Sequence, residues 1–376
     1  MTTASSTRPH SVALPLWPLV AAICLLAALV WTGSLETVAP TLNVIASAAS
    51  EPNFYGSALA GLGLLAGGTV AHWLQAKQRP WQGFGQACGS GLWVPMLASA
   101  LLGVAISNLA WGWTLAGGSW QPLFVPFVSV SPTVVLMFGA DARTVLTGGV
   151  LGGLLTPPLS VLGADVICPW LGVPPVVGVT GGMAVGAVIA FTVCRHLPWL
   201  PAPLHLRHKP DAHEVPVVEK HGPTWLLRRS LADFSEAQFF GSEWASFGVI
   251  LGVVVAYVLN PALPAYGSGL LWHILAAQAL TAIIGVVLWR GQWARRPFYP
   301  TFVPVVSVAP ACVLAYGGTT ASIVAGAVLG AATSPPLAAA ISSRLPTDFH
   351  PFIGNVAAMA IATSVIVPPL QLLPGF

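Results

Sequence analysis

The chain has 376 residues, of which 7% are charged and 55% hydrophobic, with a formal net charge of +3 and a mean hydropathy of +0.79. Soluble domains carry roughly 25% charged residues. The composition therefore excludes a surface that faces water over most of the molecule, and it predicts a protein of the lipid bilayer. The small net charge does not favour a nucleic-acid partner. The five cysteines have no CxxC spacing, and we predict no metal site and no cofactor.

The first apolar stretch runs from Leu14 to Leu35. It is longer than the core of a secretory signal peptide, which has about 7–15 residues, and no small-residue cleavage site adjoins it. We therefore interpret residues 1–49 as an N-terminal tail and an anchor helix, with a signal peptide as the alternative.

Two long segments repeat each other without a gap. “FVPFVSVSPTVVLMFGADARTVLTGGVLGGLLTPPL” begins at Phe124, and “FVPVVSVAPACVLAYGGTTASIVAGAVLGAATSPPL” begins at Phe302. “SEPNFYGS” at Ser50 likewise returns as “SEAQFFGS” at Ser235, and “VGVTGGMA” returns as “IGNVAAMA”. Matched prolines, glycines and Ser-Glu pairs in one order indicate a duplication. The predicted organisation is repeat unit 1 at 50–199, a cytoplasmic linker at 200–234 and repeat unit 2 at 235–376.

Each unit contains five apolar elements. In the first unit they lie at about 56–75, 90–113, 122–139, 144–163 and 174–194. In the second they lie at about 241–260, 267–289, 301–316, 320–341 and 351–372. With the N-terminus cytoplasmic, these crossings place every Lys and Arg on the cytoplasmic side, where such residues gather. An odd number of crossings per unit would invert the second unit.

The sequence thus predicts an all-α polytopic protein of the inner (plasma) membrane, with a cytoplasmic N-terminus and an outer C-terminus. One helix followed by two inverted five-element units resembles the organisation of five-plus-five transporters and channels, such as the urea-transporter and leucine-transporter groups. The resemblance covers most of the chain but lies in the organisation only, so no functional residue is carried over. It implies a solute site between the two units, near the membrane midplane.

The third and fourth elements of each unit contain prolines at matching places. Phe124–Phe138 and Phe302–Tyr316 have about 15 residues each, fewer than the roughly 20 of a spanning helix. “VSVSP” and “VSVAP” within them favour extended backbone, and “TPPL” and “SPPL” predict a break in the fourth element. Interrupted segments at corresponding places of two inverted halves indicate a solute site.

We expect these breaks to bring hydroxyl groups together, with Ser129 across from Ser307 and Thr156 across from Ser334. The predicted substrate-binding residues are Ser129, Ser131, Thr133, Thr156, Ser307, Ser334, Thr180 and Asn355. Two alternatives stay open. Such hydroxyls also bond their own or neighbouring helices, and the third and fourth elements could form a re-entrant hairpin, with Arg143 at a costly buried tip.

Glu243 and His273 are candidates for ion or proton coupling, because ionisable residues in membrane helices are often functional. Their repeat counterparts, Ala58 and Pro95, cannot titrate. An interfacial position near a helix end is the alternative explanation for both.

The composition and the repeats together favour a membrane transporter or channel for a small polar solute, with the lipid bilayer and a small molecule or ion as partners. A homo-oligomer is compatible with the sequence. A non-transporting scaffold or assembly subunit is the alternative. A membrane-embedded enzyme is the least favoured class, because the predicted spans contain almost no groups that could act as acid, base or nucleophile.

Overall fold

The computed structural model describes residues 45–114, 122–207 and 221–376, and within these ranges it contains helices and no β-strand. The main helices of the first half are α4 (Ala58–Ala76), α5 (Trp93–Trp111), η3 (Pro122–Val128), α6 (Val130–Phe138), α7 (Ala142–Leu162) and α9 (Pro175–Cys194). Those of the second half are α12 (Glu243–Leu259), α13 (Leu271–Leu288), η7 (Val303–Val306), α15 (Val308–Tyr316), α16 (Thr320–Ser342) and α17 (Phe352–Leu370). Between the halves lie α11 (Pro223–Ala232) and η5 (Asp233–Ser235).

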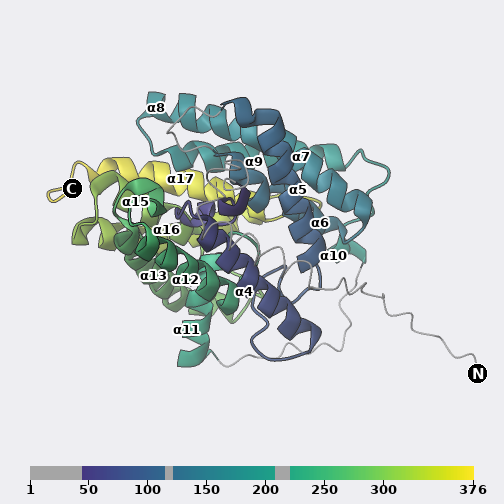
Figure 1. Cartoon of the computed structure of the whole chain (residues 1–376), viewed down its shortest axis with the longest axis horizontal. Coiled ribbons are helices and arrows are strands. Elements are labelled where there is room, and N and C mark those ends of the chain that lie inside the picture. Colours follow the sequence, from purple (N-terminus) through teal and green to yellow (C-terminus); the bar gives the residue numbers. More distant parts are fainter. Residues whose placement is uncertain (1–44, 115–121, 208–220) are drawn as a thin grey trace, which may run out of the picture.

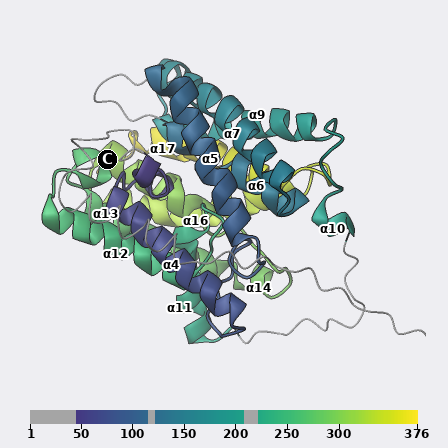
Figure 2. The same ribbon diagram turned by 45° about the vertical axis from the view of Figure 1, so that its right-hand side comes forward.

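Short elements complete the described chain. They are η1 (Glu51–Asn53), η2 (Gly112–Thr114), the π-helical turn η4 (Gly163–Ile167), α8 (Cys168–Leu171), α10 (Leu204–Arg207), η6 (Pro264–Gly267) and α14 (Arg290–Trp293). The helices α5, α6, α7 and α9 gather on one side of the molecule, and α11, α13, α15 and α16 on the other (Figures 1 and 2). The last helix of each half, α9 and α17, pack against each other.

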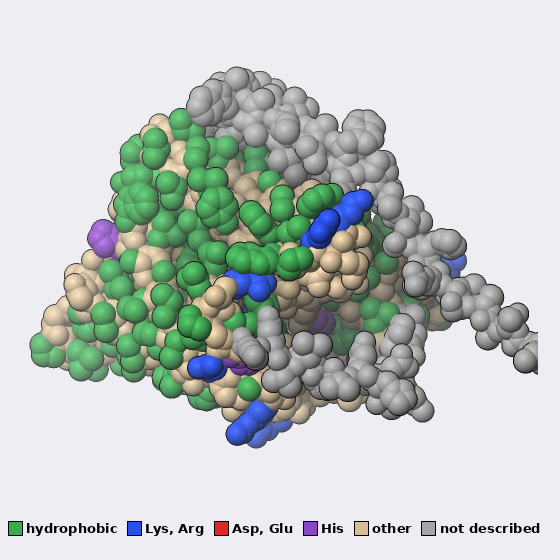
Figure 3. All heavy atoms as spheres, turned by 90° about the horizontal axis from the view of Figure 1, so that it is seen from below, with side chains coloured by type: hydrophobic (Ala, Val, Ile, Leu, Met, Phe, Trp, Pro, Cys, Tyr) green, Lys and Arg blue, Asp and Glu red, His purple; other side chains and the backbone are tan. Residues whose placement is uncertain are grey.

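In the described ranges, six helices are long and apolar enough to cross a membrane. They are Trp93–Thr114, Ala142–Leu171, Pro175–Cys194, Leu271–Leu288, Thr320–Ser342 and Phe352–Leu370. Large apolar side chains point outward from them and their neighbours; Leu109 and Val258, for example, are 86% and 74% exposed. In Figure 3, hydrophobic side chains cover much of the face shown, while Lys and Arg gather toward one part of it. These are the features of a multi-pass membrane protein. The predicted anchor, Leu14–Leu35, lies outside the described residues.

The two halves meet along α4 and α12, which lie side by side (Figure 1). A Cβ atom on Gly63 would overlap the carbonyl of Gly248, and one on Gly248 would overlap the carbonyl of Gly63. Gly67 meets Trp244 in the same way, while Gly252 meets Leu59. Contacts that run forward on one helix and backward on the other show that α4 and α12 are antiparallel. Glycine is required here because the two backbones touch.

The third elements are helical, so the expectation of extended backbone in “VSVSP” and “VSVAP” is wrong. The break in each is confined to one residue, Ser129 (φ −133°, ψ −117°) between η3 and α6, and Ser307 (φ −142°, ψ −84°) between η7 and α15. Each serine hydroxyl bonds the carbonyl four residues earlier, at 2.5 Å for Ser129 and 2.7 Å for Ser307. These side-chain bonds hold the turn where the backbone ladder is interrupted.

The fourth elements are unbroken, which corrects the prediction of Pro-broken helices there. Pro157 lacks the N–H that would bond the Gly153 carbonyl within α7, and the Trp111 indole N–H donates to that carbonyl instead, at 3.2 Å. In α16, Pro335 leaves the Ala331 carbonyl without its donor, and the Trp289 indole N–H donates to it at 2.8 Å. A neighbouring helix thus supplies the missing donor, so the helix continues through the proline pair.

Candidate solute cavity between the two halves

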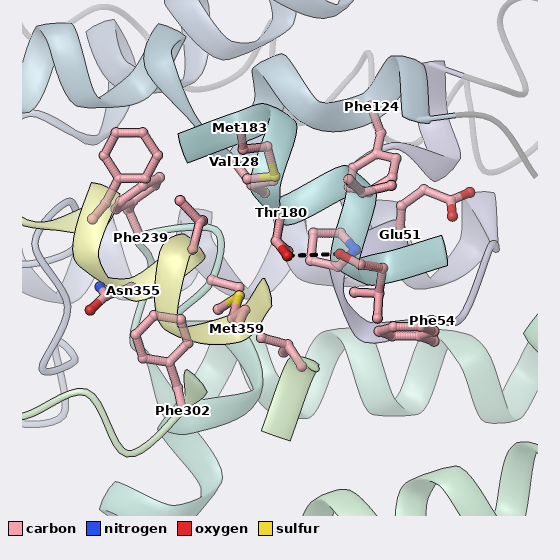
Figure 4. A pocket seen from close by; sticks show the side chains of 17 residues that line it. Glu51, Phe54, Phe124, Val128, Thr180, Met183, Phe239, Phe302, Asn355 and Met359 are labelled. Atoms are coloured by element: carbon pink, nitrogen blue, oxygen red, sulfur yellow. Dashed lines mark hydrogen bonds between the residues drawn. The ribbon is translucent and has the colours of Figure 1, made fainter. Parts of the chain in front are cut away.

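A cavity of about 50 Å³ lies between the two halves. Its walls come from η1 and the residues after it, η3 and α9 in the first half, and from the segment before α12, η7 and α17 in the second. We call it the central cavity. Figure 4 shows Phe54 and Phe124 on one side of it, Phe239 and Phe302 on the other, and Met183, Thr180 and Met359 between them.

The lining residues fall into pairs that the sequence repeat relates. Sixteen of the 17 lining residues form eight such pairs, which occupy matched positions of the two units. The pairs are Pro52 with Ala237, Phe54 with Phe239, Phe124 with Phe302, Val128 with Val306, Val176 with Phe352, Val179 with Asn355, Thr180 with Val356, and Met183 with Met359. The remaining residue is Glu51, whose counterpart Glu236 does not line the cavity. The two halves therefore contribute the same positions to one space.

The cavity wall is almost entirely apolar. Five phenylalanines, five valines and two methionines line it. The Thr180 hydroxyl donates to the Val176 carbonyl of its own helix at 2.7 Å, the dashed line in Figure 4. The Glu51 carboxylate lies at the edge of the group in Figure 4 and accepts a hydrogen bond from the Tyr266 hydroxyl at 2.7 Å. A charged solute would lose its hydration in this space and gain few polar partners.

Two larger hollows lie next to the central cavity. One, of about 450 Å³, shares Phe54 and Val176 with it and is also lined by Tyr316. We call it the Tyr316 vestibule. The other, of about 930 Å³, is lined by Phe349, His350 and Pro351. We call it the His350 vestibule.

The two vestibules also use matched positions of the repeat. Leu136 and Met137 line the His350 vestibule, and their counterparts Leu314 and Ala315 line the Tyr316 vestibule. Pro174 and Pro175 line the Tyr316 vestibule. Their counterparts in the second unit, His350 and Pro351, line the His350 vestibule. In the described part of the chain, the central cavity is thus accompanied by two vestibules whose linings include matched positions.

An aromatic cluster lies between the central cavity and the His350 vestibule. The rings of Phe239, His350 and Phe352 are pairwise 5.8–6.0 Å apart between centroids. Burial lowers the pKa of His350 to about 3, with His205 adding to the effect, so the imidazole is neutral at physiological pH. The cluster is therefore an apolar plug on this side of the cavity.

Of the predicted substrate-binding residues, Thr180 and Asn355 line the central cavity and the other six do not. All six are fully buried: Ser129, Ser131, Thr133, Thr156, Ser307 and Ser334. Thr133 and Thr156 donate to carbonyls of their own helical segments, both at 2.7 Å, as Ser129 and Ser307 do. Ser129 and Thr156 lie together, with 3.4 Å between their side-chain oxygens. Ser131 packs between Gly103 and Gly152, and its hydroxyl, like that of Ser334, has no partner among the described residues.

The two predicted coupling residues also lie away from the central cavity. Glu243 begins α12, is 4% exposed and accepts a hydrogen bond from Nε of Arg228 at 2.6 Å. His273 is half-buried near the start of α13 and packs against Gly318.

The repeated “SExxFxGS” motifs are the part of the site that sequence reasoning missed. The Asn53 amide donates to the Phe234 carbonyl at 2.8 Å, and the Gln238 amide donates to the Ala49 carbonyl at 2.8 Å. Gln238 also donates to Asn53 Oδ1 at 2.7 Å. The two motifs therefore bond each other reciprocally at the junction of the halves. The sequence feature that could have indicated this contact is a set of polar residues that occurs twice in an otherwise apolar chain.

No family model, no curated protein and no solved structure matches this chain.

Proposed function

We propose that this protein is a membrane transporter or channel that moves a small uncharged solute through the central cavity, from one vestibule to the other. The observation that carries the proposal is the paired lining of the cavity, in which the two halves supply matched residues to one space. Two copies of one scaffold in opposite orientations give inward- and outward-facing shapes of similar energy, and solute sites lie between such copies.

Several local geometries support an inverted repeat. The helices α4 and α12 are antiparallel and touch at equivalent glycines, Gly63 and Gly248. The two tryptophan–carbonyl bonds occur at equivalent positions, as do the two serine breaks. The segments 163–174 and 260–270, which contribute residues such as Gly172 and Tyr266 to the Tyr316 vestibule, contain no Lys or Arg. These features support the predicted orientation, with the His350 vestibule on the cytoplasmic side.

The chemistry of the cavity supports an uncharged solute. Phenylalanine, valine and methionine side chains cannot replace the hydration shell of an ion, and a narrow apolar passage excludes ions by expelling water. A small neutral molecule, such as urea, acetamide or glycerol, loses less hydration on entry. The plug formed by Phe239, His350 and Phe352 would have to open during transport.

The test is solute flux in proteoliposomes, followed by stopped-flow light scattering with urea, acetamide and glycerol against protein-free liposomes. The variants Val128→Trp and Val306→Trp fill the cavity from equivalent sides and should reduce flux to the protein-free rate. The control is Val150→Trp, a change at a residue that is 41% exposed on the outer face of α7. Wild-type flux in both cavity variants, or no flux of any solute above the protein-free rate, would overturn the proposal.

A further inference from the structure

A buried ionic cluster is formed by α11 and the segment that links it to α12, outside the spanning helices. Nη2 of Arg229 donates to Asp233 Oδ1 at 2.6 Å and to Glu236 Oε2 at 2.7 Å. The Thr301 hydroxyl donates to Asp233 Oδ1 at 3.2 Å. Arg229 and Asp233 are fully buried, and Glu236 is 3% exposed. We call these three charged residues the Arg229 triad.

The triad holds two carboxyl groups and one guanidinium. The preceding residue, Arg228, is paired with Glu243 at 2.6 Å. Asp233 Oδ2 is buried and has no hydrogen-bond partner among the described residues. A carboxylate that is buried without full compensation is costly, whereas one proton on Asp233 Oδ2 would make the triad neutral.

Two aromatic rings contact the Arg229 guanidinium. Its central carbon lies 5.2 Å from the centroid of Phe84 and 4.8 Å from that of Trp293. Its Nε and Nη1 are buried and make no hydrogen bond in the described chain. The rings hold the cation in place, so a change of charge on the triad must be absorbed by Asp233 and Glu236.

The triad is joined directly to the wall of the central cavity. Glu236 precedes Ala237, which lines the cavity, and Phe239 of the aromatic plug follows two residues later. Phe239 has a φ of 65°, a left-handed conformation that is uncommon for a bulky residue. The Phe239 carbonyl accepts a hydrogen bond from the Ala87 N–H at 3.0 Å. A displacement of Glu236 therefore moves a short, strained segment that forms both wall and plug.

We propose that Arg229, Asp233 and Glu236 form a proton-binding site, and that loading of this site changes how Ala237 and Phe239 close the central cavity. This inference rests on the proposed function: if the protein transports a solute, the proton that binds to the triad either drives or regulates that transport. Proton binding itself, and its effect on the cavity wall, can be measured without transport.

The groups around Asp233 agree with this assignment. Burial raises the pKa of Asp233 to about 6, against the opposing effect of Arg229 and with Glu236 adding to the rise. Burial, with Glu236 and Glu243, also raises the pKa of the Cys88 thiol, which stays neutral. Tyr299 packs with Trp293 on the same side, and burial raises the pKa of its hydroxyl. His221 stacks on Trp225 at 3.9 Å between ring centroids and is the neighbouring group that needs a control.

The first test is infrared difference spectroscopy of the purified full-length protein between about pH 5 and about pH 8. The carbonyl stretching band of a protonated carboxyl group should appear at the lower pH and be lost in Asp233→Asn. It should persist in Asp165→Asn, which removes an exposed carboxyl group, and in His221→Gln. An unchanged band in Asp233→Asn would overturn the assignment. Thr301→Val removes a hydrogen-bond donor to the ionised Asp233 carboxylate. The pH at which half of the infrared band is lost should therefore rise.

The second test follows the cavity wall. Ala237→Cys should react with N-ethylmaleimide, read at residue 237 by peptide mass spectrometry. Because every thiol reacts faster as the pH rises, this rate is divided by the rate of the exposed cysteine in Ser268→Cys. The relative rate should differ several-fold between about pH 5 and about pH 8. Asp233→Asn in the same background should abolish the difference, and Asp165→Asn should preserve it. Equal relative rates at both pH values would overturn the link between triad and cavity. Flux without any pH dependence would leave the proposed function intact and refute coupling, whereas absent flux with intact proton binding would refute the proposed function alone.

Discussion

Trp111 and Trp289 each donate an indole N–H to the carbonyl that a proline leaves without its helical donor. The donor comes from α5 in the first half, and from the end of α13 in the second. In each case a side chain of one helix supplies the donor that the first proline of the pair removes from its neighbour. The hydrogen bond also joins the two helices at one defined position.

Replacement of either tryptophan by phenylalanine should destabilise the protein by about 1 kcal/mol, because a buried carbonyl is left without a donor while most of the apolar contact is kept. The measurement is the midpoint of thermal unfolding in detergent for Trp111→Phe and Trp289→Phe. Trp113→Phe is the matched control, since Trp113 is 78% exposed and bonds the Ala110 carbonyl, which no proline has freed. An equal shift in all three variants would contradict the explanation.

The Arg229 triad predicts a pH dependence of stability with a definite sign. In an unfolded chain an aspartic acid titrates at about 3.9, and in the folded protein burial raises the pKa of Asp233 to about 6. The folded state therefore binds the proton more tightly, so this contribution to stability is full below the unfolded pKa and is lost as the pH rises through the folded pKa. The unfolding midpoint should fall over that range in the wild type and in Asp165→Asn, and Asp233→Asn should flatten this part of the profile. A profile that Asp233→Asn leaves unchanged would refute the contribution.

At the scale of elements, the antiparallel contact of α4 and α12 joins the two halves. It depends on glycine carbonyls that approach the opposite backbone so closely that no Cβ fits. This contact places the two “SExxFxGS” motifs, which precede these helices, against each other. Phe54 and Phe239, which belong to these motifs, are thereby brought to the wall of the central cavity.

Gly63→Ala and Gly248→Ala should each lower the thermal unfolding midpoint, because the added methyl group must push two helices apart. Gly181→Ala in α9 is the control, since a Cβ there would meet nothing within 4 Å. The control should match the wild type or exceed it slightly, because alanine is the better helix former. A wild-type unfolding midpoint in Gly63→Ala would mean that α4 and α12 can move apart without loss of stability.

Much of the helical structure was predictable from the sequence. The prediction of an all-helical chain is confirmed for the described residues, six of whose helices are long and apolar enough to cross a membrane, and α4 and α12 begin within two residues of the predicted starts at 56 and 241. The unbroken course of α7 and α16 was not predictable, because the donor that replaces the proline N–H comes from another helix. The short 3-10 turns before Ser129 and Ser307 were also missed, since the β-branched sequence favours extended backbone when tertiary packing is ignored.

At the scale of the whole molecule, two of the eight predicted substrate-binding residues lie on the wall of the central cavity, and whether any of the eight binds a solute stays a prediction. Thr180 and Asn355 line the central cavity. The other six predicted residues are polar residues near prolines; four of them bond carbonyls of their own segments, and Ser131 and Ser334 have no partner among the described residues. The cavity is lined instead by apolar side chains such as Phe124 and Met183, which cannot be told from packing residues until the two halves are assembled.

The predicted orientation can be tested by cysteine labelling in intact cells with a membrane-impermeant thiol reagent. Cysteines at Asp165 and Ser268, both exposed and predicted to lie on the outer side, should react. Cysteines at Arg143 and Arg295, also exposed, should react only after the cells are permeabilised. Ready labelling at Arg143 or Arg295 in intact cells would refute the inverted arrangement.

The order of the tryptophans and prolines along the chain has a consequence for biosynthesis. Each indole donor precedes its carbonyl acceptor by 42 residues. During translation, α5 is therefore made before α7, and the end of α13 before α16. When each proline-containing helix enters the bilayer, the residue that completes its hydrogen bonding is already there. A reversed order would expose a carbonyl without a donor to lipid until the next helix arrived, at a cost of several kcal/mol per group.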